Sequence, residues 1–219
     1  MKFTKMHGLG NDYIFVDCFA ETVTDPSRTA QLLSPAHFGV GADGLILIEP
    51  SAKADCRMRM FNADGSEGSM AGNALRCMAK YLYDNGIVRK EEMTLETDKG
   101  TKTVRVYTTD GRVTSACVDM GYATLDTTAL RLNIPKRQVV NYPVEIAGQP
   151  WEITCVDMGN PHCVVFCSRV DGVDVARIGP QFEHAPYFPD RINTEFIRVV
   201  NPSTIKMRVW ERGSGETMA

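Results

Sequence analysis

A polar, turn-rich segment leads directly into the clearest helical pattern of the chain, at residues 61–77 (FNADGSEGSMAGNALRC). The first backbone N–H groups of a helix have no partner inside the helix, and the helix dipole favours negative charge there. With Gly72 and Asn73 in its first turn, this helix start could hold a carboxylate, or a thiolate placed just before it. The commoner alternative is a cap by Ser69 or Asn73, with Glu67 complementing the dipole, and the segment alone favours it.

Two other glycine-rich stretches do not predict a nucleotide site. Residues 39–44 (GVGADG) fit the pattern GxGxxG, but a dinucleotide-binding loop follows a strand and opens a helix. This one leads into a predicted strand at residues 45–49. Residues 8–12 (GLGND) also precede a strand rather than a helix. We therefore expect these glycines in tight turns and reject both stretches as phosphate or cofactor loops.

The 7 cysteines are an odd number, scattered along the chain. Without an export signal they are expected to be reduced thiols. Paired CxxC units, which a structural zinc site needs, do not occur, so no metal site is expected. The nearest candidate is His162 and Cys163 with Cys167. There Cys163, Val165 and Cys167 alternate on one face of a predicted strand, which favours buried strand thiols over metal ligands.

Short strand patterns outnumber helical ones, which predicts an α+β protein rather than a doubly wound parallel sheet. The strongest helix prediction covers residues 72–84, where apolar residues recur at helical spacing and Asn85-Gly86 supplies the stop. Weaker helix predictions cover residues 28–33 and 173–182. The predicted strands are residues 13–18, 45–49, 56–62, 93–97, 103–107, 113–120, 151–158, 163–167, 194–200 and 204–210.

Two short similarities suggest an internal duplication. Residues 65–71 (GSEGSMA) resemble residues 213–219 (GSGETMA), and the tetrapeptide VDMG occurs at both 118–121 and 156–159. We therefore predict two similar lobes, an N-terminal one at residues 1–118 and a C-terminal one at residues 119–219.

Composition excludes several classes of protein. The chain has 219 residues, with 24 Lys and Arg against 27 Asp and Glu, a net charge of -3. This balance gives no electrostatic footprint for nucleic acid or an anionic membrane, so neither is an expected partner. No apolar run is long enough to span a membrane, and the N-terminus lacks the apolar core of a secretory signal. We expect a cytoplasmic protein.

Seven motifs in order along the chain resemble the diaminopimelate epimerase family. They are MHGLGNDY at the N-terminus, HFGVGADGL at 37–45, FNADGSE at 61–67, GN and RC within 72–77, MGNPHCV at 158–164, FPDRIN at 188–193 and WERGSGET at 210–217. The resemblance implies two pseudo-symmetric lobes, each a mixed β-sheet or barrel around a central helix. It also implies a homodimer that interconverts LL- and meso-diaminopimelate, an amino-acid substrate, without cofactor or metal, on the route to lysine and peptidoglycan.

In this family two cysteine thiols transfer the proton, one removing it and the other returning it on the opposite face of the α-carbon. Each lies at the N-terminus of its lobe's central helix, where the dipole favours the thiolate. Carried over to this sequence, the first thiol position is Ala71, and His162 and Glu211 are expected to assist catalysis. The expected substrate-binding residues are Asn11, Asn62, Gly72, Asn73, Asn160, Asn193, Glu211 and Arg212.

The sequence departs from the family at both thiol positions. The family has Cys-Gly-Asn where this chain has Ala71-Gly72-Asn73, and a methyl group cannot transfer a proton. Cys77 is no substitute, because six helical residues rotate it by ~240° and move it ~9 Å along the axis; we expect it inside the lobe. The second thiol is expected just after Ala219, so the second lobe is expected to lack its central helix and the cover for its strands.

Three interpretations of the function remain open. The first is diaminopimelate epimerase, impaired because Ala71 stands in the thiol position, either through a deliberate substitution or in a natural paralogue. The second is a related two-cysteine racemase for another amino acid, such as histidine. The third is an inactive paralogue that binds the amino acid without converting it.

Overall fold

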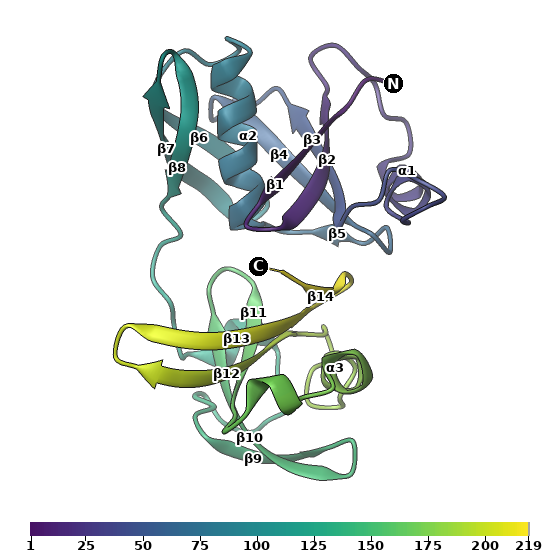
Figure 1. Ribbon diagram of the computed structural model, residues 1–219, viewed down its shortest axis with the longest axis vertical. Helices are drawn as coiled ribbons and strands as arrows, with labels where there is room; N and C mark the ends of the chain where they lie inside the picture. Colours follow the sequence, from purple (N-terminus) through teal and green to yellow (C-terminus); the bar gives the residue numbers. More distant parts are fainter. Residues whose placement is uncertain (219) are drawn as a thin grey trace. The chain divides into compact units, whose positions relative to one another are not determined.

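The computed structural model describes residues 1–218, which form two compact units, Met1–Met120 and Gly121–Met218. Both units are mixed β-sheets with few helices (Figure 1). This confirms the predicted α+β class. Within the described part of the chain, no helix is both long and apolar enough to cross a membrane.

The first unit is built on one sheet of eight strands in the order β1-β2-β3-β4-β6-β7-β8, with β5 paired to β4. The pairs β2–β3 and β4–β6 are parallel and the others are antiparallel. The strands are β1 (Thr4–Gly8), β2 (Asn11–Asp17), β3 (Gly44–Glu49), β4 (Cys56–Asn62), β5 (Glu67–Gly68), β6 (Glu92–Thr97), β7 (Gly100–Thr109) and β8 (Arg112–Val118).

Helix α2 (Gly72–Asp84) is the centre of this unit and has the bounds predicted from its apolar spacing. Strands β1 and β8, at opposite edges of the sheet, both contact it, so the sheet curls around the helix (Figure 1). The buried face of α2 includes Leu75, Met78 and Leu82 at 0% exposure, and Cys77 lies in the same core as predicted. Helix α1 (Pro26–Leu33) packs with a second, smaller apolar cluster that includes Ile14 and Leu45.

The second unit has six strands in the order β14-β13-β12-β11-β10-β9, of which only β11–β12 is a parallel pair among the described residues. Phe182 of α3, Phe196 and Trp151 pack edge to face at 5.4–6.1 Å and form the middle of its core. The elements are η1 (Thr127–Leu130), β9 (Tyr142–Ile146), β10 (Gln149–Asp157), β11 (Pro161–Phe166), η2 (Val170–Gly172), α3 (Val175–Glu183), β12 (Asn193–Asn201), β13 (Thr204–Glu211) and β14 (Gly215–Thr217).

The two units repeat one order of elements. In the first, the order is β1-β2-α1-β3-β4-β5, and in the second it is β10-β11-α3-β12-β13-β14, with a parallel pair across each helix. The similar heptapeptides at 65–71 and 213–219 contain the corresponding strands β5 and β14. The repeated VDMG does not belong to this duplication, because its two copies end β8 and β10, which are not equivalent strands.

One face of the second sheet carries exposed apolar side chains. Helix α3 packs on the other face, through Phe182 and Phe196. The strand register places Phe166, Val199, Ile205 and Met207 on the face away from α3, where they are 58%, 55%, 56% and 42% exposed. We call these four residues the apolar sheet face.

Candidate active site

Helix α2 begins without a side-chain cap. Its N-cap is Ala71, in extended conformation (φ -138, ψ 118), and within residues 1–218 no hydrogen bond from that side chain reaches the first turn. The first helical bond runs from the backbone N–H of Leu75 to the Ala71 carbonyl at 3.0 Å. The prediction that Ser69 or Asn73 caps this helix is therefore wrong. The N–H groups of the first turn stay available for an anion.

Glu67 also does not act as predicted. Its carboxylate is held by Arg59, whose Nε donates to Oε1 at 2.7 Å and whose Nη2 donates to Oε2 at 3.2 Å. This two-point contact raises the pKa of Arg59. Glu67 is thus bound to the neighbouring strand β4 and does not complement the dipole of α2.

The side chain of Asn73 instead joins a chain of hydrogen bonds that leads to the half-buried carboxylate of Asp43. Asn73 Nδ2 donates to Asn11 Oδ1 at 3.2 Å, and Asn11 Nδ2 donates to Asp43 Oδ2 at 2.7 Å. Arg76 Nη2 donates to the side-chain oxygen Oδ1 of Asn73. Asn11 is only 2% exposed. The structure therefore brings together Asn11 and Asn73, two predicted substrate-binding residues, at the start of α2.

Asp43 connects the loop before β3 to the start of strand β2. It also accepts from the backbone N–H of Asp12 at 3.0 Å. Burial is the main cause that raises the pKa of Asp43, and the hydrogen bonds from Asp12 and Asn11 partly oppose it. Gly8 lies close to this network, since a Cβ there would lie 3.2 Å from Asn73 Cβ. We define the site network as Asn11, Asp43, Asn73 and Arg76.

Asn62 lies at the end of β4 and is 7% exposed. Its Nδ2 donates to Ser66 Oγ at 2.9 Å, across the turn between β4 and β5. Asn62 is therefore held by its own turn rather than by the site network.

Gly72 is the first residue of α2 and allows a close approach of Met120, since a Cβ at Gly72 would lie 3.1 Å from Met120 Sδ.

In the second unit, Asn193 links two segments that carry predicted site residues. Its Nδ2 donates to the Pro161 carbonyl at 2.8 Å, and its Oδ1 accepts from the backbone N–H of Arg212 at 2.9 Å. The Arg212 guanidinium donates to the Asp190 carbonyl at 3.0 Å. Asn193 thus joins the segment before His162 to the loop after β13.

His162 is held between two oxygens. Its Nδ1 lies 2.6 Å from Glu195 Oε1, and its Nε2 lies 2.9 Å from Asn160 Oδ1. These contacts bring together His162 and Asn160, both predicted site residues. Glu195 was not predicted from the sequence.

The loop that carries Glu211 and Arg212 rests on a buried carboxylate. Glu183, 4% exposed, accepts from Trp210 Nε1 at 2.7 Å, from the Gly213 backbone N–H at 3.0 Å and from Arg191 at 3.2 Å. Glu211 accepts a hydrogen bond from Thr217 Oγ1 at 2.7 Å. The loop is thereby fixed at both of its ends.

The cysteines of the described residues are free thiols, as predicted. Cys163 is fully buried opposite Cys155 on the neighbouring strand, and burial raises its pKa. Burial likewise raises the pKa of Cys77. A raised pKa disfavours the reactive thiolate, so these thiols are structural. Ala219, where the second thiol was expected to follow, lies outside the described residues.

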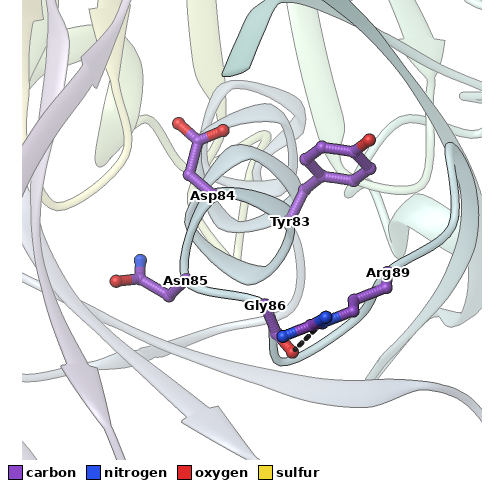
Figure 2. A pocket seen from close by; sticks show the side chains of 5 residues that line it. All are labelled: Tyr83, Asp84, Asn85, Gly86 and Arg89. Atoms are coloured by element: carbon purple, nitrogen blue, oxygen red, sulfur yellow. Dashed lines mark hydrogen bonds between the residues drawn. The ribbon is translucent and has the colours of Figure 1, made fainter. Parts of the chain in front are cut away.

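A pocket of about 370 Å³ lies elsewhere in the first unit, at the C-terminal end of α2 (Figure 2). It is lined by Tyr83, Asp84, Asn85, Gly86 and Arg89. A 13-residue helix is roughly 20 Å long, so this pocket is remote from Ala71. Asp84 is already bound by Lys80 at 2.7 Å. The pocket contains none of the predicted site residues.

Comparison with known proteins decides the family. The family model described as Diaminopimelate epimerase matches residues 3–125 and 154–219. The chain belongs to the diaminopimelate epimerase family. It is 51% identical to the diaminopimelate epimerase of Acetivibrio thermocellus over 219 residues, which is 100% of this chain and 78% of that protein. It is 50% identical to the diaminopimelate epimerase of Desulfovibrio desulfuricans, again over 100% of this chain and 78% of that protein.

Solved structures of other proteins have a fold similar to that of this chain. A probable proline racemase from Agrobacterium radiobacter K84 aligns with a TM-score of 0.74 at 14% identity, over 99% of this chain and 72% of that chain. A hydroxyproline epimerase from Agrobacterium vitis aligns with a TM-score of 0.72 at 13% identity and the same coverage. The fold is thus one that racemases and epimerases of amino acids also use.

Sequence reasoning missed the residues that hold the site residues in place. They are Asp43, Arg76, Glu183 and Glu195. Asp43 lies inside the motif HFGVGADGL, and Glu195 follows Asn193 at strand spacing on β12, so their positions were visible. Their partners come from distant segments, which a single sequence does not reveal.

Proposed function

We propose that this chain is a diaminopimelate epimerase scaffold that binds LL- and meso-diaminopimelate and inverts one α-carbon without a cofactor. The observation that carries the proposal is 51% identity to a curated diaminopimelate epimerase along the whole chain. The uncapped start of α2 supports it, because free N–H groups and the helix dipole suit an α-carboxylate.

The reaction removes a weakly acidic α-hydrogen, so negative charge develops on the α-carbon and its carboxylate. In our proposal the N–H groups of Gly72 and Asn73 hold that carboxylate and stabilise the charge. The base that removes the hydrogen belongs at position 71, where a thiol would benefit from the same helix dipole. Ala71 offers only a methyl group, so this chain is expected to bind substrate and to exchange the α-hydrogen slowly.

The remaining predicted residues have proposed roles that follow from their donors and acceptors. Asn11 and Asn62 in the first unit, and Asn160 and Asn193 in the second, each offer amide donors and acceptors for amino-acid groups. The guanidinium of Arg212 suits a carboxylate in a two-point contact. The carboxylate of Glu211 suits an ammonium group, and His162 is proposed to assist proton transfer.

Calorimetric titration tests the binding part of the proposal. The 219-residue chain is titrated with LL-diaminopimelate, meso-diaminopimelate and histidine, the last to test the related-racemase interpretation. We expect saturable binding of both diaminopimelate isomers and none of histidine at the same concentration. Binding of histidine but not of diaminopimelate would contradict the proposal. Tight binding of diaminopimelate with no exchange of its α-hydrogen, even in Ala71→Cys, would favour the inactive paralogue. The residue Ala71 makes this paralogue the second candidate.

Exchange of the α-hydrogen in deuterated water tests the chemical part. Ala71→Cys should raise the exchange rate by a factor on the order of 10²–10⁴, the usual contribution of one general acid or base. Ala71→Ser is the matched control, because its hydroxyl has similar size but does not ionise near neutral pH. Rates are compared at saturating diaminopimelate, because the serine hydroxyl can also compete with the substrate for the helix N–H groups. Equal exchange rates for the chain and for Ala71→Cys would exclude a catalytic role of position 71.

We also propose that the protein acts in the cytoplasm as a homodimer and without pyridoxal phosphate. Family membership supports this proposal. Sedimentation equilibrium should give twice the 24.3 kDa chain mass. The visible absorption spectrum of freshly purified protein should lack a pyridoxal phosphate band.

A further inference from the structure

His162 and Glu195 form a pair across two parallel strands of the second unit. The register pairs His162 of β11 with Asn193 and Val164 with Glu195, so both side chains project from the same face of the sheet. Glu195 Oε1 lies 2.6 Å from His162 Nδ1. The Glu195 side chain is 13% exposed and that of His162 is 25% exposed. The contact is therefore largely removed from water, where hydrogen bonds to a charged group are strong.

The chemistry of the pair determines where the imidazole carries its proton. An ionised carboxylate only accepts hydrogen bonds, so the contact at 2.6 Å requires a proton on Nδ1. The other nitrogen, Nε2, lies 2.9 Å from the Asn160 side chain. The Asn160 oxygen would accept only from a protonated Nε2, so beside a neutral ring protonated on Nδ1 the amide is turned over and its nitrogen donates to Nε2. Both orientations keep the requirement for a proton on Nδ1. The ring is thus held from both sides, with Nε2 directed toward Asn160.

Among the described residues, the Glu195 carboxylate makes no second hydrogen bond like the one to His162. Its second oxygen, Oε2, is buried and has no hydrogen-bond partner among residues 1–218. A buried acceptor without a partner is costly, so a purely structural role would be poorly served by a carboxylate at this position. The contact with His162 is the one use of this side chain that the described residues show.

We propose that Glu195 is a positioning residue that holds His162 in the tautomer protonated on Nδ1 and directs Nε2 toward Asn160. Its importance for catalysis rests on the proposed function, in which His162 assists proton transfer. The tautomer itself does not depend on that function. Glu195 acts through His162 and needs no contact with substrate.

Nitrogen NMR of the protein labelled with ¹⁵N-histidine tests the proposal in the absence of substrate. The chain has 4 histidines, and the variant His162→Gln identifies the signals of His162. We expect His162 to show a protonated Nδ1 in the unsubstituted chain. Glu195→Leu should change the ratio of the two neutral tautomers at least about tenfold toward the Nε2–H form, the size expected from one hydrogen bond to a charged group.

Two further variants separate positioning from simple disturbance of the fold. Glu195→Gln keeps a carbonyl acceptor and should give a tautomer ratio between those of the unsubstituted chain and Glu195→Leu. If Glu195→Leu does not fold, the comparison of Glu195→Gln with the unsubstituted chain tests the proposal. Glu145→Leu, on the exposed position 145 of β9, is the matched control and should leave the His162 signals unchanged.

An unsubstituted chain whose His162 carries its proton on Nε2 would overturn the proposal. So would a folded Glu195→Leu, or failing that Glu195→Gln, with an unchanged tautomer ratio. Calorimetry with diaminopimelate on the unsubstituted chain reports separately on the proposed function. If diaminopimelate does not bind but His162 has the expected tautomer, only the proposed function is refuted. If diaminopimelate binds but the tautomer is not the expected one, only the role of Glu195 is refuted.

Discussion

Asp43 accepts hydrogen bonds from the Asn11 side chain and from the Asp12 backbone, and through Asn11 it orients Asn73. The amide of Asn11 therefore has a fixed direction, with its nitrogen toward Asp43 and its oxygen toward Asn73. A fixed amide loses less conformational entropy when it binds a ligand. At the scale of single residues, the candidate site depends on this carboxylate as much as on the amides.

Asp43→Asn should lower the free energy of unfolding by about 1–3 kcal/mol at neutral pH, because a neutral amide oxygen accepts the two bonds, both made to Oδ2, more weakly than a carboxylate does. The comparison should also depend on pH. The pKa of Asp43 is raised in the folded state from its usual 3.8, so the folded chain holds the proton where the unfolded chain has lost it. The contribution of this titration is therefore greatest below pH 3.8 and is lost as pH rises through the folded pKa.

Urea unfolding from pH 3.5 to pH 7, followed by circular dichroism, measures this effect for both proteins. The stability advantage of the unsubstituted chain over Asp43→Asn should shrink as the pH rises through the acid range. An advantage that grows with pH would show that Asp43 has a lowered rather than a raised pKa.

At the scale of elements, helix α2 shows both the strength and the limit of sequence reasoning. Its bounds follow from apolar spacing within 13 residues and from the Asn85-Gly86 stop, which are local signals. Its cap was predicted wrongly because Asn73 was treated as a local residue. In the fold the Asn73 side chain donates a hydrogen bond to Asn11, 62 positions away. Because of this contact, the side chain does not cap the start of the helix.

Ala71→Ser should stabilise the protein, because a serine at the N-cap accepts a hydrogen bond from the first turn. We expect a gain of about 0.5–2 kcal/mol in the free energy of unfolding by urea. The same hydroxyl would compete with a carboxylate for those N–H groups, so calorimetric affinity for diaminopimelate should fall. Higher stability with unchanged affinity would mean that the substrate carboxylate does not bind at the start of α2.

Gly179 positions the loop of Arg212 through Trp210. A Cβ at Gly179 would lie 2.3 Å from Trp210 Cδ2, so the indole packs directly on the backbone of α3. From that place Trp210 donates to Glu183, which also holds the Gly213 backbone. Gly179 was not predicted to matter, because a glycine inside a predicted helix carries no local sign of its packing partner.

Gly179→Ala should therefore lower the free energy of unfolding by about 1–3 kcal/mol through overpacking. Intrinsic tryptophan fluorescence should report the displacement of Trp210. The matched control is Gly172→Ala, where the nearest atom to the added Cβ is 4.0 Å away. Equal effects of the two substitutions would show that the contact with Trp210 is not the cause.

At the scale of the whole molecule, the sequence predicted the α+β fold class and most of the strands, but not all of them. The ten predicted strands all occur, while β1, β5, β9 and β14 were missed. Strands β5 and β14 have only two and three residues, too short for an alternating pattern. Strand β1 is largely exposed, and its pairing with β2 rather than its own composition makes it a strand. The duplication became clear only from the order and direction of strands.

The apolar sheet face of the second unit has a measurable consequence for the 219-residue chain. Contiguous exposed apolar side chains bind hydrophobic dyes, whereas isolated ones do so weakly. The double variant Phe166→Ser with Ile205→Thr removes two of its four residues, and the fluorescence of bound anilinonaphthalene sulfonate should fall at least about twofold. Phe38→Ser is the control, because Phe38 is 97% exposed on a loop of the other unit. Equal losses for both variants would mean that the dye does not report the apolar sheet face.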